Sequence, residues 1–516
     1  MRYLIPAVLI LAAAPLKAQE ATILEAALGD YTRPVTTSSD EAQAWFDQGV
    51  QMMYAFAKGE APASFEEAAR RDSTCGMCWW AVAWSYGPYL NGGMRGSDNP
   101  SAYAAALRAA ELGGGTPVEQ ALIEAMTVRY AEEWDSDQRA RLDTLYANAL
   151  ADVVTAFPDD LDAATLYGEA LMLLEPRRGR WSIDDPDVQH IHRVLEGVLE
   201  KDIQHPGACH LYIHATESTT EPGKAEACAE YLGDSIPGAS HINHMPSHTF
   251  NRIGRWGDAV RGNIQAWHSD QKAAFGQGFA IYPSHNLHML LFAASMDGQG
   301  AVAVQAGKDY SKIVDGGQFY EVLALLRFGR FDEILEMTDT PQQPVFRGLW
   351  DFGRGYAHLR VGDPDNARAY IERISRTISE NPDASFRGHS AEELLGVCLR
   401  ILRAELHRTD GEHDAAIALL EEAVELEDGL RYDEPEPLNF SARHWLGNAL
   451  LDAGRPADAE AAFRAALEDH PKNGWSLFGL RQALEAQGRS EDASAVEEQF
   501  RASWARADTW IRAAVF

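Results

Sequence analysis

The stretch WLGNALLDAGRPADAEAAFRAALEDHP, residues 445–471, decides the fold class of this 516-residue chain. Small residues such as Gly447 and Ala459 allow two helices to approach each other closely. Gly454 breaks the chain between the two expected helices, and Pro471 ends the second one. The stretch therefore predicts a pair of packed helices joined by a tight turn.

Units of the same kind occur along most of the chain. They cover residues 475–488, 400–425, 349–374 and 314–337, and units with insertions fill the N-terminal half. The pattern resembles the tetratricopeptide repeat family, in which helix pairs of 34 residues stack into a superhelix. The resemblance implies an all-α solenoid of roughly ten helix pairs whose first helices line the concave face. Sustained alternation of polar and apolar residues is missing, so we expect no β domain.

The N-terminus reads as a secretory leader. Arg2 gives a short basic start, and the apolar run 4–14 is too short to span a bilayer. We expect a signal peptide of residues 1–18 and an exported, soluble protein, periplasmic if the host has two membranes. Behind the leader we expect three regions: N-terminal repeats with insertions (19–189), histidine-rich repeats (190–312) and C-terminal repeats (313–516).

The charge of the chain excludes some classes of partner. Its net charge is −32 at pH 7, which disfavours nucleic acid and anionic membranes because both need a basic surface. No later stretch is apolar enough for membrane insertion. The sequence also lacks a phosphate-binding loop, a G-x-S-x-G elbow and an H-E-x-x-H helix. We therefore expect no nucleotide cofactor.

Five cysteines would lie in an oxidising compartment if the chain is exported. Cys75 and Cys78 form a C-x-x-C pair, which is a redox pair, half of a zinc site or a local disulfide. A second C-x-x-C is missing, and we favour the disulfide. Cys209 and Cys228 flank an expected helix turn, so antiparallel packing would bring them level and allow a second disulfide. Cys398 is left over.

Two histidine pairs repeat at the period of the helix units. His210 and His214 are four residues apart, and so are His244 and His248, 34 positions later. Residues i and i+4 share one face of a helix. Because the two pairs are one repeat apart, their imidazoles should meet on neighbouring first helices.

Other residues extend this set. His241 and Glu217 fall on the same helix faces as the two pairs, and His285 and His288 follow on the first helix of the next unit. The stretches HPGACHLYIHATE and ASHINHMPSHTFNRIGRW also resemble an exported subgroup of tetratricopeptide proteins with a histidine-rich centre, to which we attach no reaction. The predicted metal ligands are His210, His214, His241, His244, His248, His285, His288 and Glu217.

The metal and the reaction stay open at this stage. A mixed histidine and carboxylate set favours zinc or iron, and a surplus of histidines favours copper. Facing an open groove, such an ion could activate dioxygen or hydrolyse a substrate, and we lean to an oxidoreductase. Arg252 could hold an anionic substrate group or form a salt bridge, and Tyr212 and Tyr282 could wall a pocket or pack in the core. The alternatives are a zinc hydrolase and a metal-free adaptor with a peptide in its concave groove.

Overall fold

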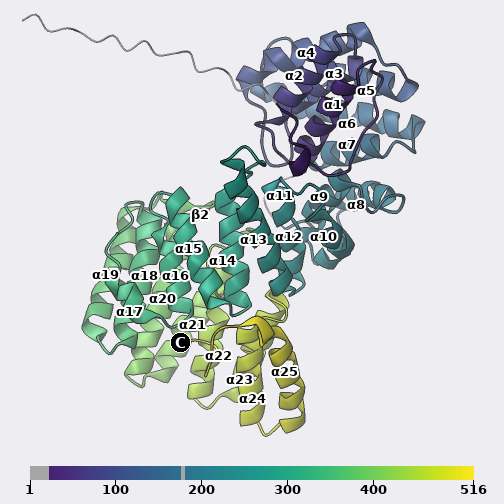
Figure 1. Ribbon diagram of the computed structural model, residues 1–516. Coiled ribbons are helices and arrows are strands. Elements are labelled where there is room, and N and C mark those ends of the chain that lie inside the picture. The colour runs from purple at the N-terminus through teal and green to yellow at the C-terminus, as the bar shows by residue number, and fades with distance from the viewer. Residues whose placement is uncertain (1–21, 176–179) are drawn as a thin grey trace, which may run out of the picture.

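The computed structural model describes residues 22–175 and 180–516, and Figure 1 shows them as a succession of packed helices. The expected signal peptide, residues 1–18, lies outside the described residues, so export remains a prediction. Within the described part of the chain, no helix combines the length and the apolar character needed to cross a membrane.

Helices that are neighbours in sequence pack against each other throughout the N-terminal half. Several of these helices begin with a side-chain cap; Thr116, for example, forms a reciprocal capping box with Glu119 at the start of α5. The N-terminal helices are α1 (Asp40–Tyr54), α2 (Ala61–Arg71), α3 (Gly76–Tyr86), α4 (Asn99–Leu112), α5 (Pro117–Thr127), α6 (Arg139–Ala156), α7 (Leu161–Met172) and α8 (Pro186–Leu199).

The central helices carry the histidines. They are α9 (Pro206–Glu217), α10 (Glu226–Leu232), α11 (Ser240–His244), α12 (Pro246–Arg252), α13 (Trp256–Ala273), α14 (Pro283–Met296) and α15 (Gly300–Ile313). The three histidine groups lie on the first helices of successive units, as predicted. Pro246 divides the first helix of the middle unit into α11 and α12, because proline fits the first turn of a helix but not its interior.

The C-terminal half continues the helix pairs, and the all-α prediction is confirmed. Among residues 22–175 and 180–516, the only paired strands are β1 (Ser385–Phe386) and β2 (His389–Ser390), a short hairpin. The helices are α16 (Gln318–Arg327), α17 (Phe331–Glu336), α18 (Pro344–Arg360), α19 (Pro364–Glu380), α20 (Ala391–Thr409), α21 (His413–Asp428), α22 (Ala442–Asp452), α23 (Pro456–Asp469), α24 (Gly474–Ala486) and α25 (Ser490–Ser503).

The last residues of the chain hold the C-terminal repeats against the centre, and Figure 1 shows α22–α25 below α13 and α14. Arg506 forms a two-bonded ion pair with Asp297, which is fully buried at the end of α14. Asp508 accepts hydrogen bonds from the backbone N–H groups of Gly300 and Ala301 at the start of α15. These contacts fix the C-terminal repeats relative to the helices that carry the histidines.

Candidate metal centre

Six of the seven predicted histidines gather into two groups of three on α9, α11, α12 and α14. Within each group, one nitrogen from each ring lies within 4.8 Å of the others, and all of the rings except that of His285 are buried. We call these sets group 1 (His210, His214, His241) and group 2 (His244, His248, His285).

Group 1 is built from α9 and the start of α11. The Nε2 atoms of His210 and His241 lie 3.2 Å apart. The Nδ1–H of His210 donates to the backbone carbonyl of Tyr54, at 2.6 Å. The ring of Phe56 covers the group, with its centroid 4.2 Å from that of His210. The N-terminal helix α1 therefore holds one of the imidazoles in place.

Group 2 is built from α11, α12 and α14. The Nε2 atom of His248 lies 2.7 Å from that of His244 and 3.5 Å from that of His285. The Nδ1–H of His244 donates to the side-chain oxygen of Asn263 on α13, at 2.7 Å. The amide nitrogen of Asn263 donates to the carbonyl of Ala259, which fixes which end of the amide faces the histidine.

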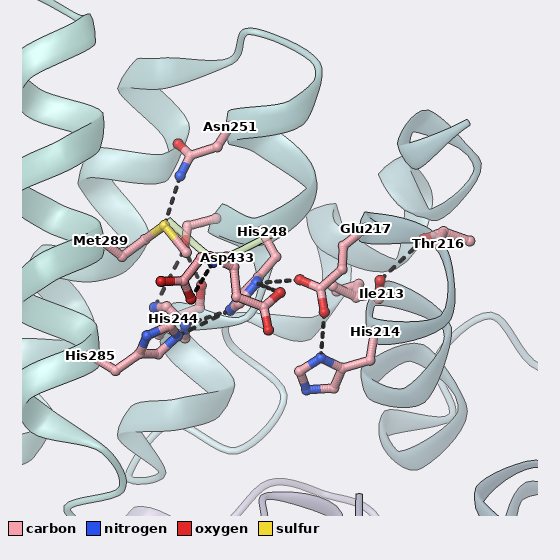
Figure 2. Close-up of polar contacts among 12 residues, drawn as sticks. Ile213, His214, Thr216, Glu217, His244, His248, Asn251, His285, Met289 and Asp433 are labelled. Atoms are coloured by element: carbon pink, nitrogen blue, oxygen red, sulfur yellow. Dashed lines mark hydrogen bonds and ion pairs between the residues drawn. The ribbon is translucent and has the colours of Figure 1, made fainter. Parts of the chain in front are cut away.

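Glu217 lies between the two groups, as Figure 2 shows. One of its carboxylate oxygens accepts from Nδ1–H of His214, at 2.7 Å, and the other contacts Nδ1 of His248. The Glu217 side chain is only 1% exposed. With Glu434, which lies 3.3 Å from Nδ1 of His248, it also forms a third candidate ligand set with His214.

These contacts decide which nitrogen of each ring is available to a metal. A carbonyl or carboxylate oxygen only accepts, so each ring that bonds one through Nδ1 carries its hydrogen there when it is neutral. The lone pair is then on Nε2. Two imidazoles bound to one tetrahedral ion at about 2.0–2.1 Å have nitrogens about 3.3 Å apart. The Nε2 separations of 3.2 and 3.5 Å are close to that value, and the separation of 2.7 Å between His244 and His248 is shorter.

Burial favours the neutral form of three of these six rings. Burial, reinforced by neighbouring imidazoles, holds the pKa of His241, His244 and His285 well below the usual value for histidine. At His248 burial also lowers the pKa, but the Glu217 carboxylate, with Glu434, outweighs it and raises the pKa to about 10. An ion bound at group 2 would therefore replace a proton on His248.

His214 and His241 of group 1 and His248 and His285 of group 2 line a partly open cavity of about 460 Å³. The β1–β2 hairpin and residues 431–434, before α22, also line it, together with Leu90, Asn91, Tyr282 and Ser284. Arg387 in the hairpin forms a two-bonded ion pair with Asp433, which joins these two segments. The connecting segments of the C-terminal half thus cover the histidines of the central units.

Three predicted site residues lie elsewhere. The Nε2 atom of His288 shares a hydrogen bond of 2.7 Å with the hydroxyl of Tyr320, so His288 stands apart from both groups. The Tyr212 hydroxyl donates to Glu196 on α8 and does not reach the cavity. Arg252 lines a smaller neighbouring pocket with residues such as Trp256.

Tyr282 lines the cavity as predicted, with its ring edge-on to that of His241 at a centroid distance of 5.0 Å. Its φ is +56°, in the left-handed region. Phe56 and Arg387, with φ of +59° and +53°, also lie against the site, and Lys472 is the only other described non-glycine residue with positive φ. Strained backbone of this kind concentrates at functional sites.

Both predicted cysteine pairs come together as disulfides. Cys75 pairs with Cys78, and Cys209 pairs with Cys228, with Cα atoms 5.3 Å and 5.0 Å apart. Cys398 is free and buried. The second disulfide ties α9 to α10 directly beside His210, so it fixes the helix that carries most of group 1.

Sequence reasoning missed the residues that reach the site from the C-terminal half: Arg387, His389, Arg431, Tyr432, Asp433 and Glu434. They lie in connecting segments without helical periodicity. The one available signal is the concentration of charged residues in RYDEPEP, residues 431–437, between two helix pairs.

Comparison with known proteins bears on the repeats alone. A family model for the tetratricopeptide repeat matches residues 450–499, and no curated protein is similar to the chain in sequence. Among solved structures, MamA AMB-1 is 21% identical over 36% of this chain and 95% of its own, with a TM-score of 0.21. A human IFIT1 dimer with m7Gppp-AAAA is 11% identical over 91% of both chains, with a TM-score of 0.32.

The TPR domain of P58(IPK) is 10% identical over 87% of this chain and 99% of its own, with a TM-score of 0.22. TM-scores this low say nothing of function. The family match, by contrast, falls on α23, α24 and α25, and the same packed helix pairs recur through the rest of the described chain. Residues 450–499 of this chain are therefore tetratricopeptide repeats, within an all-α chain of packed helix pairs.

Proposed function

We propose that this protein binds transition-metal ions at group 1 and group 2. The observation that carries the proposal is the arrangement of the ring nitrogens. In His210, His214, His244 and His248 the Nδ1 atom faces an oxygen, and within each group Nε2 atoms approach one another. Nitrogen lone pairs that face each other in a buried site need a cation between them, either a proton or a metal ion.

The donor set narrows the choice of metal. Neutral imidazole suits copper, zinc and iron, and a nearby carboxylate such as Glu217 or Glu434 favours zinc or iron. Six imidazoles in two groups exceed what a single zinc ion needs, which favours copper. The absence of cysteine from all three candidate sets is compatible with each of these metals.

We extend the proposal to catalysis, with an oxidoreductase preferred to a hydrolase. A structural ion is usually closed off by four protein ligands, whereas His241, His248 and His285 line a cavity of about 460 Å³. A cavity of that size leaves room for water or a small molecule beside the ions. A bound copper or iron ion would supply redox chemistry there, and a zinc ion would supply an activated water.

Metal analysis of protein purified without an affinity tag tests the binding. We expect bound metal in the wild type and loss of most of it in the double variant His214→Ala, His248→Ala, which removes one ligand from each group. The matched control is His358→Ala with His407→Ala. Each of these histidines pairs with a single carboxylate, Asp363 or Glu412, and lies on a helix, α18 or α20, that carries no member of either group. Full metal content in the first variant would contradict the proposal.

Turnover needs its own test. Metal-free protein is reconstituted with copper, iron or zinc. Each sample is screened for oxygen consumption in the presence of an added reductant, which supplies the electrons, and for ester and amide hydrolysis. Oxygen consumption with copper or iron, lost in the double variant, is the expected result. Tight metal retention without turnover would leave a metal-binding scaffold and would remove the catalytic part of the proposal.

A second candidate is a metal-free adaptor, which the tetratricopeptide architecture favours. Stacked helix pairs present extended surfaces that suit a peptide or protein partner and need no ion. Wild-type protein that neither contains nor takes up metal, but binds a peptide partner measurably, would decide for this candidate.

A further inference from the structure

Glu217 connects the two histidine groups through direct contacts. It is the last residue of α9, three positions after His214, so its side chain lies on the same face of the helix. From there it reaches His248 on α12, in the next repeat unit. Figure 2 shows the carboxylate between the two rings, one oxygen toward each.

Both contacts use the Nδ1 atom, and in His248 the Nε2 atom then faces those of His244 and His285. The hydrogen bond from Nδ1 of His214 is 2.7 Å long, and His248 Nδ1 contacts the other oxygen. An acceptor at Nδ1 fixes the orientation of a metal-binding imidazole and makes its Nε2 atom a better ligand. Glu217 is placed to do this for one ring in each group at the same time.

The two groups are also close enough to influence each other. The ring centroids of His214 and His248 are 5.7 Å apart, and so are those of His241 and His244. Two divalent cations held this near each other repel strongly in a buried site. A carboxylate between them offsets part of that repulsion, and its loss should weaken the second ion more than the first.

We infer that Glu217 is the positioning residue that makes group 1 and group 2 a single two-ion centre, in which the second ion binds only because this carboxylate is shared. The inference rests on the proposed metal binding. In this centre Glu217 acts through His214 and His248 and is not itself a ligand, because its two oxygens face their Nδ1 atoms. The third set, His214 with Glu217 and Glu434, then holds no ion.

The test is the variant Glu217→Gln, with Cu²⁺ as the probe. A glutamine offers one oxygen and one NH₂ group, so it accepts from only one of the two Nδ1–H groups and opposes the other. We expect two copper ions per chain in the wild type and one in the variant. The matched control is Glu196→Gln. Glu196 lies on α8 and bonds Tyr212, which shares the helix α9 with Glu217. This control variant should keep both ions.

Electron paramagnetic resonance adds a readout that a merely structural role would not change. Neighbouring Cu²⁺ ions interact magnetically, so the wild-type signal should be weaker than its copper content predicts. The single ion in Glu217→Gln should give the full signal. Glu217→Asp keeps a carboxylate and, where circular dichroism shows native helix content, should restore the second ion with an affinity about 10-fold lower.

The possible outcomes separate the two proposals. A wild type that takes up no copper would overturn the proposed function itself. Copper binding with one ion in the wild type, or with two equally tight ions in Glu217→Gln, would overturn this inference alone. A folded Glu217→Asp variant with one ion, or a copper-loaded structure with a Glu217 oxygen bonded to an ion, would also overturn it.

Discussion

His244 in the histidine centre and His444 in the C-terminal repeats are both fully buried on the first helix of a unit. The Nδ1–H of His244 donates to Asn263, and its Nε2 atom faces that of His248. In His444 the hydrogen sits on the other nitrogen, because Nδ1 accepts from the Arg327 guanidinium at 3.1 Å.

The Nε2–H of His444 then donates to the hydroxyl of Ser476, at 3.0 Å. Both nitrogens of this ring form hydrogen bonds with groups other than histidine, so His444 is a structural residue of the helix packing. Burial is therefore no sign of a metal ligand. What distinguishes the centre is the convergence of several Nε2 atoms whose rings are held from behind through Nδ1.

Replacing one buried histidine by alanine in each region should give the largest contrast in metal affinity. His248→Ala removes the residue that contacts both His244 and Glu217, and we expect metal affinity to fall by more than about 100-fold, beyond the usual effect of removing an outer-shell partner. Competition with a chelator measures it. His444→Ala should leave the affinity unchanged.

The control variant His444→Ala should itself be less stable than the wild type. Arg327 is buried and loses an acceptor when His444 is removed, so the free energy of unfolding should fall by about 1–3 kcal/mol. Chemical denaturation measures this. Equal loss of metal in both variants would mean that the His248 effect comes from general unfolding.

The same contrast explains how much could be predicted from sequence. Helix pairs and the faces of the histidine helices follow from local periodicity, so Gly454 at its turn, with φ of +71°, and His210 beside His241 were both accessible. Tyr212 lies two positions after His210, about 200° around the helix, so its misplacement was avoidable.

The remaining differences depend on tertiary contacts. His288 shares the helix α14 with His285 and differs only in that Tyr320 of α16 meets its Nε2 atom. Asp433 and Glu434 reach the site from a segment without secondary structure between α21 and α22. No pattern in the sequence places such a segment against a particular repeat, because the path of the segment depends on how many repeat units separate it from that repeat.

The disulfide of the histidine centre spans a helix turn, whereas that of the N-terminal half is local. Removing the disulfide of the centre should therefore lower the free energy of unfolding more than removing the local one. Cys209 and Cys228 are 19 positions apart, and Cys75 and Cys78 only three. From these loop lengths, the Cys209→Ala, Cys228→Ala double variant should lose roughly 3 kcal/mol of unfolding free energy and the other pair roughly 1.5 kcal/mol. Thermal unfolding of the two double variants measures both losses. If strain in the native disulfides outweighs loop closure, the Cys75, Cys78 variant should lose more stability than the Cys209, Cys228 variant.

The C-terminal repeats depend instead on close helix packing. The ring of Phe463 lies against Gly447 on α22 and Gly479 on α24, and a Cβ atom on Gly447 would come within 2.4 Å of that ring. Gly447→Ala should therefore lower the free energy of unfolding by about 1–3 kcal/mol despite the better helix propensity of alanine. Metal affinity should stay at the wild-type level, and a large loss would show that the two regions are mechanically coupled.

The smallest effect should come from the cavity wall of the centre. Tyr282→Phe keeps the ring that packs edge-on against His241 and removes only the hydroxyl, which shares a hydrogen bond of 2.7 Å with Tyr89. We expect a loss of about 1 kcal/mol in unfolding free energy and unchanged metal content. Denaturation and elemental analysis of the same preparation give both values. If instead metal affinity fell more than about 10-fold, the Tyr282 hydroxyl would act on the ions, and the division of the centre into histidine ligands and aromatic walls would no longer hold.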